Sequence, residues 1–375
     1  MPSLNLLIKP ASGNCNMKCT YCFYRDVAEK RKQYSYGFMK ETTLENIIKQ
    51  NFAFANKDCT IAYQGGEPTL IGLDFYKKSI ELQKQYNCKH ISVHNAIQTN
   101  GYCLNDDWAR FFAENNFLVG LSLDGTKDTH NSFRHDKDDK DTFNRIMKTA
   151  GLFNKHGVEY NILTVVNSRT AKHINGIYNF YKKNHFRYLQ FIPCLDPLGE
   201  EAGGHEYSLT PRIFGSFLKD LFDLWYQDFT CGYEIHIDQF ENYIGMLMGQ
   251  PSVSCGMNGI CSIQNVIEAD GEVYPCDFYV LDKYKLGNLN HCSFESVYQK
   301  RDELKYIEES TNSAPKCKTC PHEFICRGGC KRNREPFENG EYKLNYFCES
   351  YSMFFEHSLE RLVRLAQHFS RKADR

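Results

Sequence analysis

The chain has 375 residues, with 45 Lys and Arg against 46 Asp and Glu, which gives a net charge of −1. This balance, without a long basic run, gives no reason to expect a nucleic acid or a membrane surface as partner. No apolar run approaches the ~18–20 residues that cross a bilayer, and the apolar patch 4–8 is shorter than the ~7–15 residues of a secretion signal. We therefore expect a cytoplasmic protein with no membrane-spanning segment.

Apolar, β-rich runs alternate with segments of helical periodicity from residue 4 to about residue 196. The predicted strands are 4–8, 59–64, 91–99, 117–125, 160–166 and 188–196. The helices predicted between them are 43–55, 75–86, 106–116, 141–157 and 173–185. Such βα alternation predicts a parallel sheet, either as an open (β/α)6 barrel or as a doubly wound sheet. Both arrangements place functional loops at the carboxyl ends of the strands.

The pattern changes in the last third of the chain. Two further helices are predicted, at 210–229 and 238–250, before a cysteine-rich irregular stretch. Within residues 263–280, two short strands joined at Asp270-Gly271 read as a hairpin. We expect a barrel domain over residues 1–234 and a second domain over residues 235–375 that ends in a helix.

Seventeen cysteines are unusual in a chain without a predicted export signal, because reducing cytosol disfavours structural disulfides. Metal ligation is therefore the leading interpretation. Six have no close cysteine neighbour and are interpreted as isolated thiols: Cys59, Cys88, Cys103, Cys194, Cys231 and Cys292. The other eleven form a group of three (Cys15, Cys19 and Cys22) and a group of eight (Cys255, Cys261, Cys276, Cys317, Cys320, Cys326, Cys330 and Cys348).

The sizes of the two groups are informative. Eight thiolates fully ligate two four-cysteine centres, whereas three leave one metal with an open coordination position. A closed centre can only pass charge, and an open one can bind a substrate. Zinc is the alternative for the C-terminal eight, because the segment 317–330 has a spacing that serves a tetrahedral zinc site.

The spacing Cys15-xxx-Cys19-xx-Cys22, with Tyr21 before the third cysteine, resembles the signature of radical S-adenosylmethionine (SAM) enzymes. The resemblance implies that the trio holds a 4Fe-4S cluster, whose fourth iron chelates the amino and carboxylate groups of SAM. It also implies cleavage of SAM to a 5′-deoxyadenosyl radical and a partial barrel of six βα units, in agreement with the strand count.

The same resemblance implies further contacts to SAM. The GGEP motif after the second strand matches the segment that meets the SAM amino group, where glycine permits close approach of the backbone. Ser122 and Arg134 match positions that hold the carboxylate and ribose, and Leu195 matches a backbone contact to adenine. The full set is Tyr21, Gly65, Gly66, Glu67, Ser122, Arg134 and Leu195. Without the resemblance, the simpler interpretations are a turn for the GGEP motif, core packing for Leu195 and a solvated surface charge for Arg134.

The eight C-terminal cysteines resemble the auxiliary-cluster domain called SPASM, which occurs in radical enzymes that modify peptides. This resemblance favours iron over zinc and implies two auxiliary 4Fe-4S clusters. The first would be held by Cys255, Cys261, Cys276 and Cys330. The second would be held by Cys317, Cys320, Cys326 and Cys348.

Over roughly residues 4–365 the chain resembles anaerobic sulfatase-maturating enzymes, through LIKPAS, YQGGEPTL, LQFI with CLDPL, SCGMNG and VYPCDFYVLDK. The resemblance implies oxidation of a cysteine or serine in an unfolded or nascent sulfatase polypeptide to Cα-formylglycine. Loss of a hydrogen atom, a proton and a second electron requires a base and an electron acceptor. Asp277 matches the family's general base, and closed auxiliary clusters suit the acceptor.

Tyr24, Gln64 and Gln190 are predicted to line the substrate pocket, although each suits ordinary packing at the barrel mouth equally well. A ferredoxin or flavodoxin is the expected electron donor. One alternative is another SPASM peptide modifier, such as a thioether-forming enzyme. Such enzymes commonly carry an N-terminal leader-binding domain. We do not expect that domain here, because the first predicted strand begins near residue 4. The other is a non-enzymatic iron-sulfur or zinc protein. Cysteine-type and serine-type substrates both stay open.

Overall fold

The computed structural model describes residues 4–335, 337–338 and 341–373. Contacts divide the chain into two compact units, each discontinuous in sequence. The first comprises Met1–Leu123, Arg134–Asn161 and Ile263–Lys305, and the second comprises Asp124–Phe133, Ile162–Ser262 and Tyr306–Arg375. The predicted domain boundary near residue 235 stays a prediction. Across the described residues, no helix has the length and apolarity needed to span a membrane.

The first unit is built on a parallel sheet with the strand order β1-β2-β3-β4. These strands are β1 (Leu4–Ile8), β2 (Asp58–Tyr63), β3 (Ser92–Thr99) and β4 (Leu118–Ser122). Its helices are α1 (Phe23–Glu29), α2 (Glu41–Phe54), α3 (Leu73–Tyr86), α4 (Asp106–Glu114) and α6 (Phe143–His156). Because neighbouring strands run parallel, their carboxyl ends share one edge, and Ile8 pairs with Tyr63 there.

The predicted hairpin is confirmed, and it extends the same sheet. Strands β8 (Asn265–Ile267) and β9 (Glu272–Tyr274) pair antiparallel around Gly271, whose φ of 89° favours glycine. Strand β8 also pairs in parallel with β1, so β1 has a partner on both edges. The unit is completed by β10 (Gly287–Asn288), which pairs with β9, and by α11 (Phe294–Glu303).

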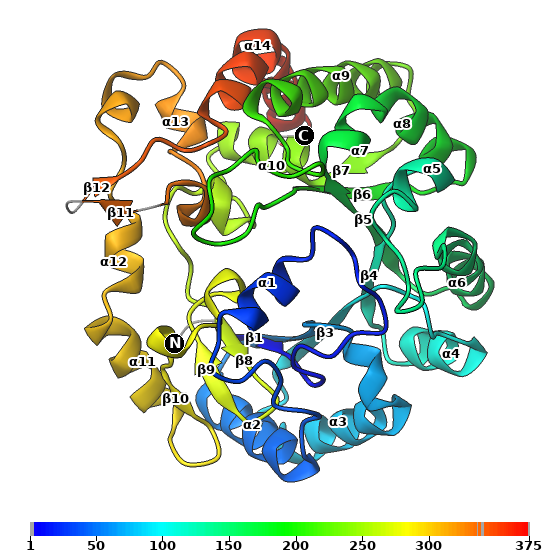
Figure 1. The fold of residues 1–375 in the computed structure, drawn as a ribbon, viewed down its shortest axis with the longest axis vertical. Helices are drawn as coiled ribbons and strands as arrows, with labels where there is room; N and C mark the ends of the chain where they lie inside the picture. The colour runs from blue at the N-terminus through cyan, green and yellow to red at the C-terminus, as the bar shows by residue number, and fades with distance from the viewer. Residues whose placement is uncertain (1–3, 336, 339–340, 374–375) are drawn as a thin grey trace. The chain divides into compact units, whose positions relative to one another are not determined.

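The second unit contains the parallel ladder of β5 (Tyr160–Val166), β6 (Tyr188–Pro193) and β7 (His236–Ile237). Its longer helices are α8 (Ile174–Lys183), α9 (Pro211–Thr230), α10 (Asp238–Leu247) and α14 (Cys348–Ala373). Short elements complete it: α5 (Lys127–His130), α7 (Ser168–Lys172), α12 (Tyr306–Ser310), α13 (Glu323–Cys326), β11 (Phe337–Glu338) and β12 (Glu341–Tyr342). Helix α14 packs along α9 through aromatic contacts such as Phe222 with Phe354 (Figure 1).

The strands and helices predicted from hydrophobic periodicity are present, with ends shifted by a few residues. Each predicted strand is followed by its predicted helix, and most apolar positions of both are buried. In the first unit an aromatic cluster holds helices and strands together. Its members with ring-to-ring contacts are Tyr63, Tyr76, Trp108, Phe112 and Phe117.

We predict that Phe112→Ala strongly destabilises the first unit. Phe112 is 0% exposed and contacts Trp108, Phe117 and Phe153, so the substitution leaves a cavity that costs about 3–5 kcal/mol. The midpoint of thermal unfolding, followed by circular dichroism, should fall by several degrees. Leu118→Ala is the control, because Leu118 is 49% exposed and its truncation should hardly move the midpoint.

Candidate active site

The three N-terminal cysteines lie in the loop that follows β1. Two tight turns form the start of this loop, with Ser12 N donating to Lys9 O at 3.1 Å and Asn14 N donating to Ala11 O at 2.9 Å. Cys22 is the N-cap residue of α1, and its backbone N donates to Cys19 O at 3.2 Å. The sequence therefore places the trio at the carboxyl edge of the sheet, as predicted.

The GGEP segment packs directly against this cysteine loop. Gly66 N donates to Ser12 O at 2.9 Å, and Glu67 N donates to Asn14 O at 2.8 Å. A Cβ at Gly66 would lie 2.1 Å from Asn14 O, so only glycine permits this approach. In the structure, the close approach at Gly66 is thus to the backbone that precedes Cys15.

The side chain of Glu67 ties the ends of β2 and β3 together. Its carboxylate accepts hydrogen bonds from Thr69 N at 3.1 Å, Thr99 Oγ1 at 2.8 Å and Asn100 N at 2.7 Å. Burial raises the pKa of Glu67, and these hydrogen bonds oppose that rise. Asn100 in turn points its amide at Cys15, with 3.7 Å between Nδ2 and Sγ.

The three thiols of the trio influence one another. Burial, together with the negative charge of Glu67 and of the neighbouring Cys19 and Cys22, raises the pKa of Cys15 to about 12. Burial also raises the pKa of Cys22. These sulfurs are therefore close together in a partly dry site. Thiolates in such a site are stabilised by a bound metal centre, which fits an iron-sulfur cluster.

Two predicted SAM contacts form a pair in the first unit. Arg134 Nη1 donates to Tyr21 Oη at 3.0 Å, and Arg134 is only 6% exposed. The simpler interpretation of Arg134 as a solvated surface charge is therefore wrong. Ser122 is half-buried at the last position of β4. Leu195 follows β6 in the second unit, and Gln190 lies on that strand.

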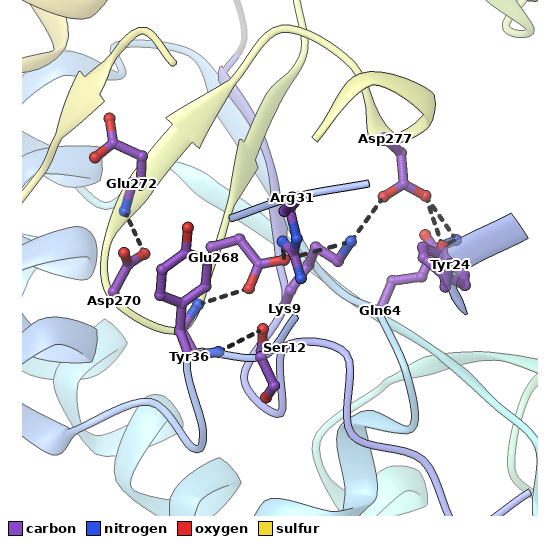
Figure 2. A network of polar contacts seen from close by, with 12 residues as sticks. Lys9, Ser12, Tyr24, Arg31, Tyr36, Gln64, Glu268, Asp270, Glu272 and Asp277 are labelled. Carbon is purple, nitrogen blue, oxygen red and sulfur yellow. Dashed lines mark hydrogen bonds and ion pairs between the residues drawn. The ribbon is translucent and has the colours of Figure 1, made fainter. Parts of the chain in front are cut away.

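Asp277 is brought together with two of the residues predicted for the substrate pocket (Figure 2). Tyr24 Oη donates to Asp277 Oδ2 at 2.6 Å, and Gln64 Nε2 lies 3.5 Å from the same oxygen. Gln64 also donates to Tyr24 Oη. Asp277 begins a short 3-10 helix, Asp277–Tyr279, directly after Cys276 and close behind β9. The pairing of β8 with β1, and of β9 with β8, brings the chain that contains this helix alongside β1.

Three charged residues around Asp277 were missed by the sequence reasoning: Lys9, Arg31 and Glu268. Lys9 Nζ lies 3.6 Å from Asp277 Oδ1 and 3.6 Å from Glu268 Oε1, and Arg31 Nη1 donates to that Glu268 oxygen at 2.7 Å (Figure 2). Lys9 is 4% exposed and Glu268 is 0% exposed. A lysine that directly follows a buried strand, in LIKPAS, is the signal that could have identified Lys9.

The charges of this network act on one another. Burial raises the pKa of Asp277, and Lys9 opposes that rise. Burial also raises the pKa of Glu268, but Lys9 and Arg31 outweigh this effect and hold its pKa below the ordinary value. Two cations and two carboxylates thus alternate from Arg31 to Asp277, so each buried charge has an opposite neighbour.

The C-terminal cysteines form groups by proximity. Burial, together with the nearby Cys348, Cys317 and Cys320, raises the pKa of Cys326 to about 12. Burial, together with Cys255 and Cys261, likewise raises the pKa of Cys330 to about 12. These seven cysteines belong to the second unit, and Cys276 belongs to the first.

The chemistry of these donors fits iron-sulfur clusters. In a 4Fe-4S cluster each thiolate binds its own iron, so the ligands surround a volume rather than one point. Within the described part of the chain, no three Cys, His, Asp or Glu side chains converge closely enough to hold a single metal ion. The cysteines are all free thiols.

Comparison with known protein families gives two matches. The model of the radical SAM superfamily matches residues 10–181, and that of the SPASM iron-sulfur cluster-binding domain matches residues 259–321. The predicted superfamily and fold class are thereby confirmed, and SAM and iron-sulfur clusters are the cofactors that these domains bind.

Individual relatives resemble nearly the whole chain. A cysteine-type anaerobic sulfatase-maturating enzyme from Clostridium novyi is 50% identical over 98% of both chains. One from Clostridium perfringens is 47% identical over 98% of this chain and 99% of that enzyme. A serine-type enzyme from Bacteroides thetaiotaomicron is 33% identical over 94% of this chain and 89% of that enzyme.

A solved structure has the same fold. Native anSMEcpe with bound AdoMet and the Kp18Cys peptide superimposes with a TM-score of 0.94 and 46% identity, covering 98% of this chain and 100% of that chain. These relatives support sulfatase maturation over another peptide modification and over a non-enzymatic metal protein. The chain belongs to the family of anaerobic sulfatase-maturating enzymes, radical SAM enzymes with a SPASM domain.

Proposed function

We propose that this chain oxidises a cysteine side chain of an unfolded sulfatase to Cα-formylglycine under anaerobic conditions, with Asp277 as the general base. The observation that carries the proposal is the Asp277 carboxylate, held by Tyr24 and Lys9 beside the cysteine loop. The greater similarity to cysteine-type relatives favours cysteine over serine, with 50% identity against 33%.

The N-terminal trio Cys15, Cys19 and Cys22 would hold the SAM cluster. The residues proposed to bind SAM are Tyr21, Gly65, Gly66, Glu67, Ser122, Arg134 and Leu195. When bound, SAM and this cluster supply the species that abstracts a hydrogen atom from the substrate. The buried Arg134 and Tyr21 form a rigid pair at the site, and the GGEP segment fixes the cysteine loop.

The geometry of Asp277 suits a base. Tyr24 Oη donates to Oδ2, whereas Oδ1 accepts no hydrogen bond from the described residues and faces Lys9 Nζ at 3.6 Å. Oδ1 therefore has a lone pair for the substrate proton, and the nearby ammonium favours the ionised carboxylate against the effect of burial. Tyr24, Gln64 and Gln190 are proposed to contact the substrate peptide.

The remaining electron would leave through the auxiliary clusters. We propose Cys255, Cys261, Cys276 and Cys330 as ligands of the first, and Cys317, Cys320, Cys326 and Cys348 as ligands of the second. The mutual effects of Cys255, Cys261 and Cys330 on their pKa values support three members of the first set, and those of Cys317, Cys320, Cys326 and Cys348 support the second. A ferredoxin or flavodoxin is the proposed electron donor. Seventeen cysteines without a disulfide favour the reducing cytoplasm as the site of action.

The function is tested with two peptides that carry a sulfatase motif and differ only in cysteine or serine at the target position. Reduced, cluster-loaded protein with SAM should convert the cysteine peptide to an aldehyde, detected by mass spectrometry together with 5′-deoxyadenosine. The serine peptide should react more slowly. Abundant 5′-deoxyadenosine without an aldehyde on either peptide would contradict the proposed function.

We predict that Asp277→Asn abolishes most aldehyde formation, by about 100-fold or more, because a general base contributes about 10²–10⁴-fold. Iron content and 5′-deoxyadenosine formation should persist, since the amide keeps the size of the carboxylate. Asp282→Asn is the control, because Asp282 lies five residues further on and bonds instead to Lys32 N at 2.9 Å. Equal aldehyde yields from wild type and Asp277→Asn would remove Asp277 from the reaction.

We predict that Lys9→Met lowers the yield of aldehyde per 5′-deoxyadenosine, because Asp277 and Glu268 lose the ammonium between them. Lys9→Arg should restore part of the yield, since it keeps the charge. The ratio of the two products is measured by mass spectrometry and chromatography. A parallel fall of both products in Lys9→Met would indicate a general structural defect rather than mispositioning of Asp277.

A further inference from the structure

Arg334 lies where the cysteine-bearing segments of the second unit meet, and it is 2% exposed. Its guanidinium is held by main-chain carbonyls from two separate loops. Nη1 donates to Asn312 O at 2.7 Å, and Nη2 donates to Ser310 O at 2.8 Å and lies 3.4 Å from Gly259 O. One rigid, planar cation thus links the loop before Cys261 to the loop before Cys317.

The same segments pack tightly against the chain around Cys326 and Cys330. A Cβ at Gly256 would lie 3.3 Å from Cys330 Cβ, and a Cβ at Gly259 would lie 2.1 Å from Arg327 O. Cys261 N also donates to Ser310 Oγ at 2.9 Å, the residue whose carbonyl binds Arg334. The position of Arg334 is therefore fixed by the backbone that presents the cysteines.

Segments of both proposed ligand sets surround the guanidinium of Arg334. Its Nη2 donates to Ser310 O, and the Ser310 side chain accepts from Cys261 N of the first set. A Cβ at Gly328, which lies between Cys326 of the second set and Cys330 of the first, would be 3.9 Å from Arg334 Nη1. Arginine stays charged under all relevant conditions, so this charge is permanent.

A buried positive charge favours the reduced form of a nearby cluster, because reduction adds one negative charge to a centre already surrounded by thiolates. The step concerned is the transfer of one electron from the substrate radical, which is thereby oxidised, to a cluster; no bond forms and no proton moves at Arg334. Net charge and hydrogen bonding are two of the factors that set cluster potentials.

We propose that Arg334 is a positioning residue shared by both auxiliary clusters, whose single fixed charge raises the two reduction potentials together. The inference rests on the two ligand sets of the proposed function. It goes beyond that function in assigning a common electrostatic control to two separate centres.

The test uses the full chain with Cys15→Ala, Cys19→Ala and Cys22→Ala, so that only auxiliary clusters are present. Redox titration followed by electron paramagnetic resonance gives both potentials. In Arg334→Met, the ratio of reduced to oxidised cluster at a fixed potential should fall about tenfold for each centre, equal to about 59 mV for a one-electron couple. Arg334→Lys should keep both potentials near those of the parent.

Arg332→Met is the matched control. It also removes one cation, but the Arg332 side chain donates to Asp196 O at 2.6 Å rather than to the carbonyls that hold Arg334. Arg332→Met should leave the potentials unchanged. A shift of only one centre in Arg334→Met, or an equal shift in Arg332→Met, would overturn the inference.

Iron counting keeps the test decisive if Arg334→Met loses clusters. Loss of about eight irons, from both four-iron centres, supports a shared role, whereas loss of about four contradicts it. A parent protein with fewer than about eight irons would refute the two ligand sets themselves, which separates failure of the proposed function from failure of the inference.

Discussion

The pairing of β1 on both of its edges is the constraint on which the catalytic site depends. One edge of β1 pairs with β2, which ends in the GGEP segment, and the other pairs with β8, which leads directly to Glu268 and, through the antiparallel β9, to Asp277. The chain that leaves β1 therefore lies between these two segments. Lys9 Nζ lies 3.6 Å from both Glu268 Oε1 and Asp277 Oδ1, and the cysteine loop follows directly after Lys9. A central strand with two parallel neighbours brings three distant segments to one edge of the sheet.

Four buried charged side chains, Arg31, Glu268, Lys9 and Asp277, are paired at this site. Burying Asp277 and Glu268 would be unfavourable in isolation, and Lys9 and Arg31 offset that cost only because all four groups lie in one chain of contacts. Removal of one member leaves an uncompensated charge on its neighbour. The base is therefore not an independent residue but the last member of a buried charge network in the first unit.

Local patterns in the sequence predicted the strands, the helices and the cysteine groups, because periodicity and ligand spacing are properties of short segments. Contacts that depend on pairing between distant segments of the chain could not be predicted from such local patterns. Nothing near residues 265–267 indicates that β8 pairs with β1, so the approach of Lys9, Arg31 and Glu268 could not be predicted. The burial of Arg134 and the contact of Gly66 with Asn14 likewise depend on segments far apart in the chain. The motif resemblance predicted Asp277 as the base, whereas only the structure shows that Tyr24 and Lys9 contact its carboxylate.

The long separation of these partners also bears on how the protein matures during synthesis. The hydrogen bond between Tyr24 and Asp277 joins residues 253 positions apart. One edge of the first strand stays without its partner until most of the polypeptide has left the ribosome, and such non-local pairing is slow to form. An N-terminal fragment that ends before β8 contains the cysteine trio but lacks both Asp277 and the second partner of β1. Completion of the reactive centre therefore waits until residue 277 has been synthesised.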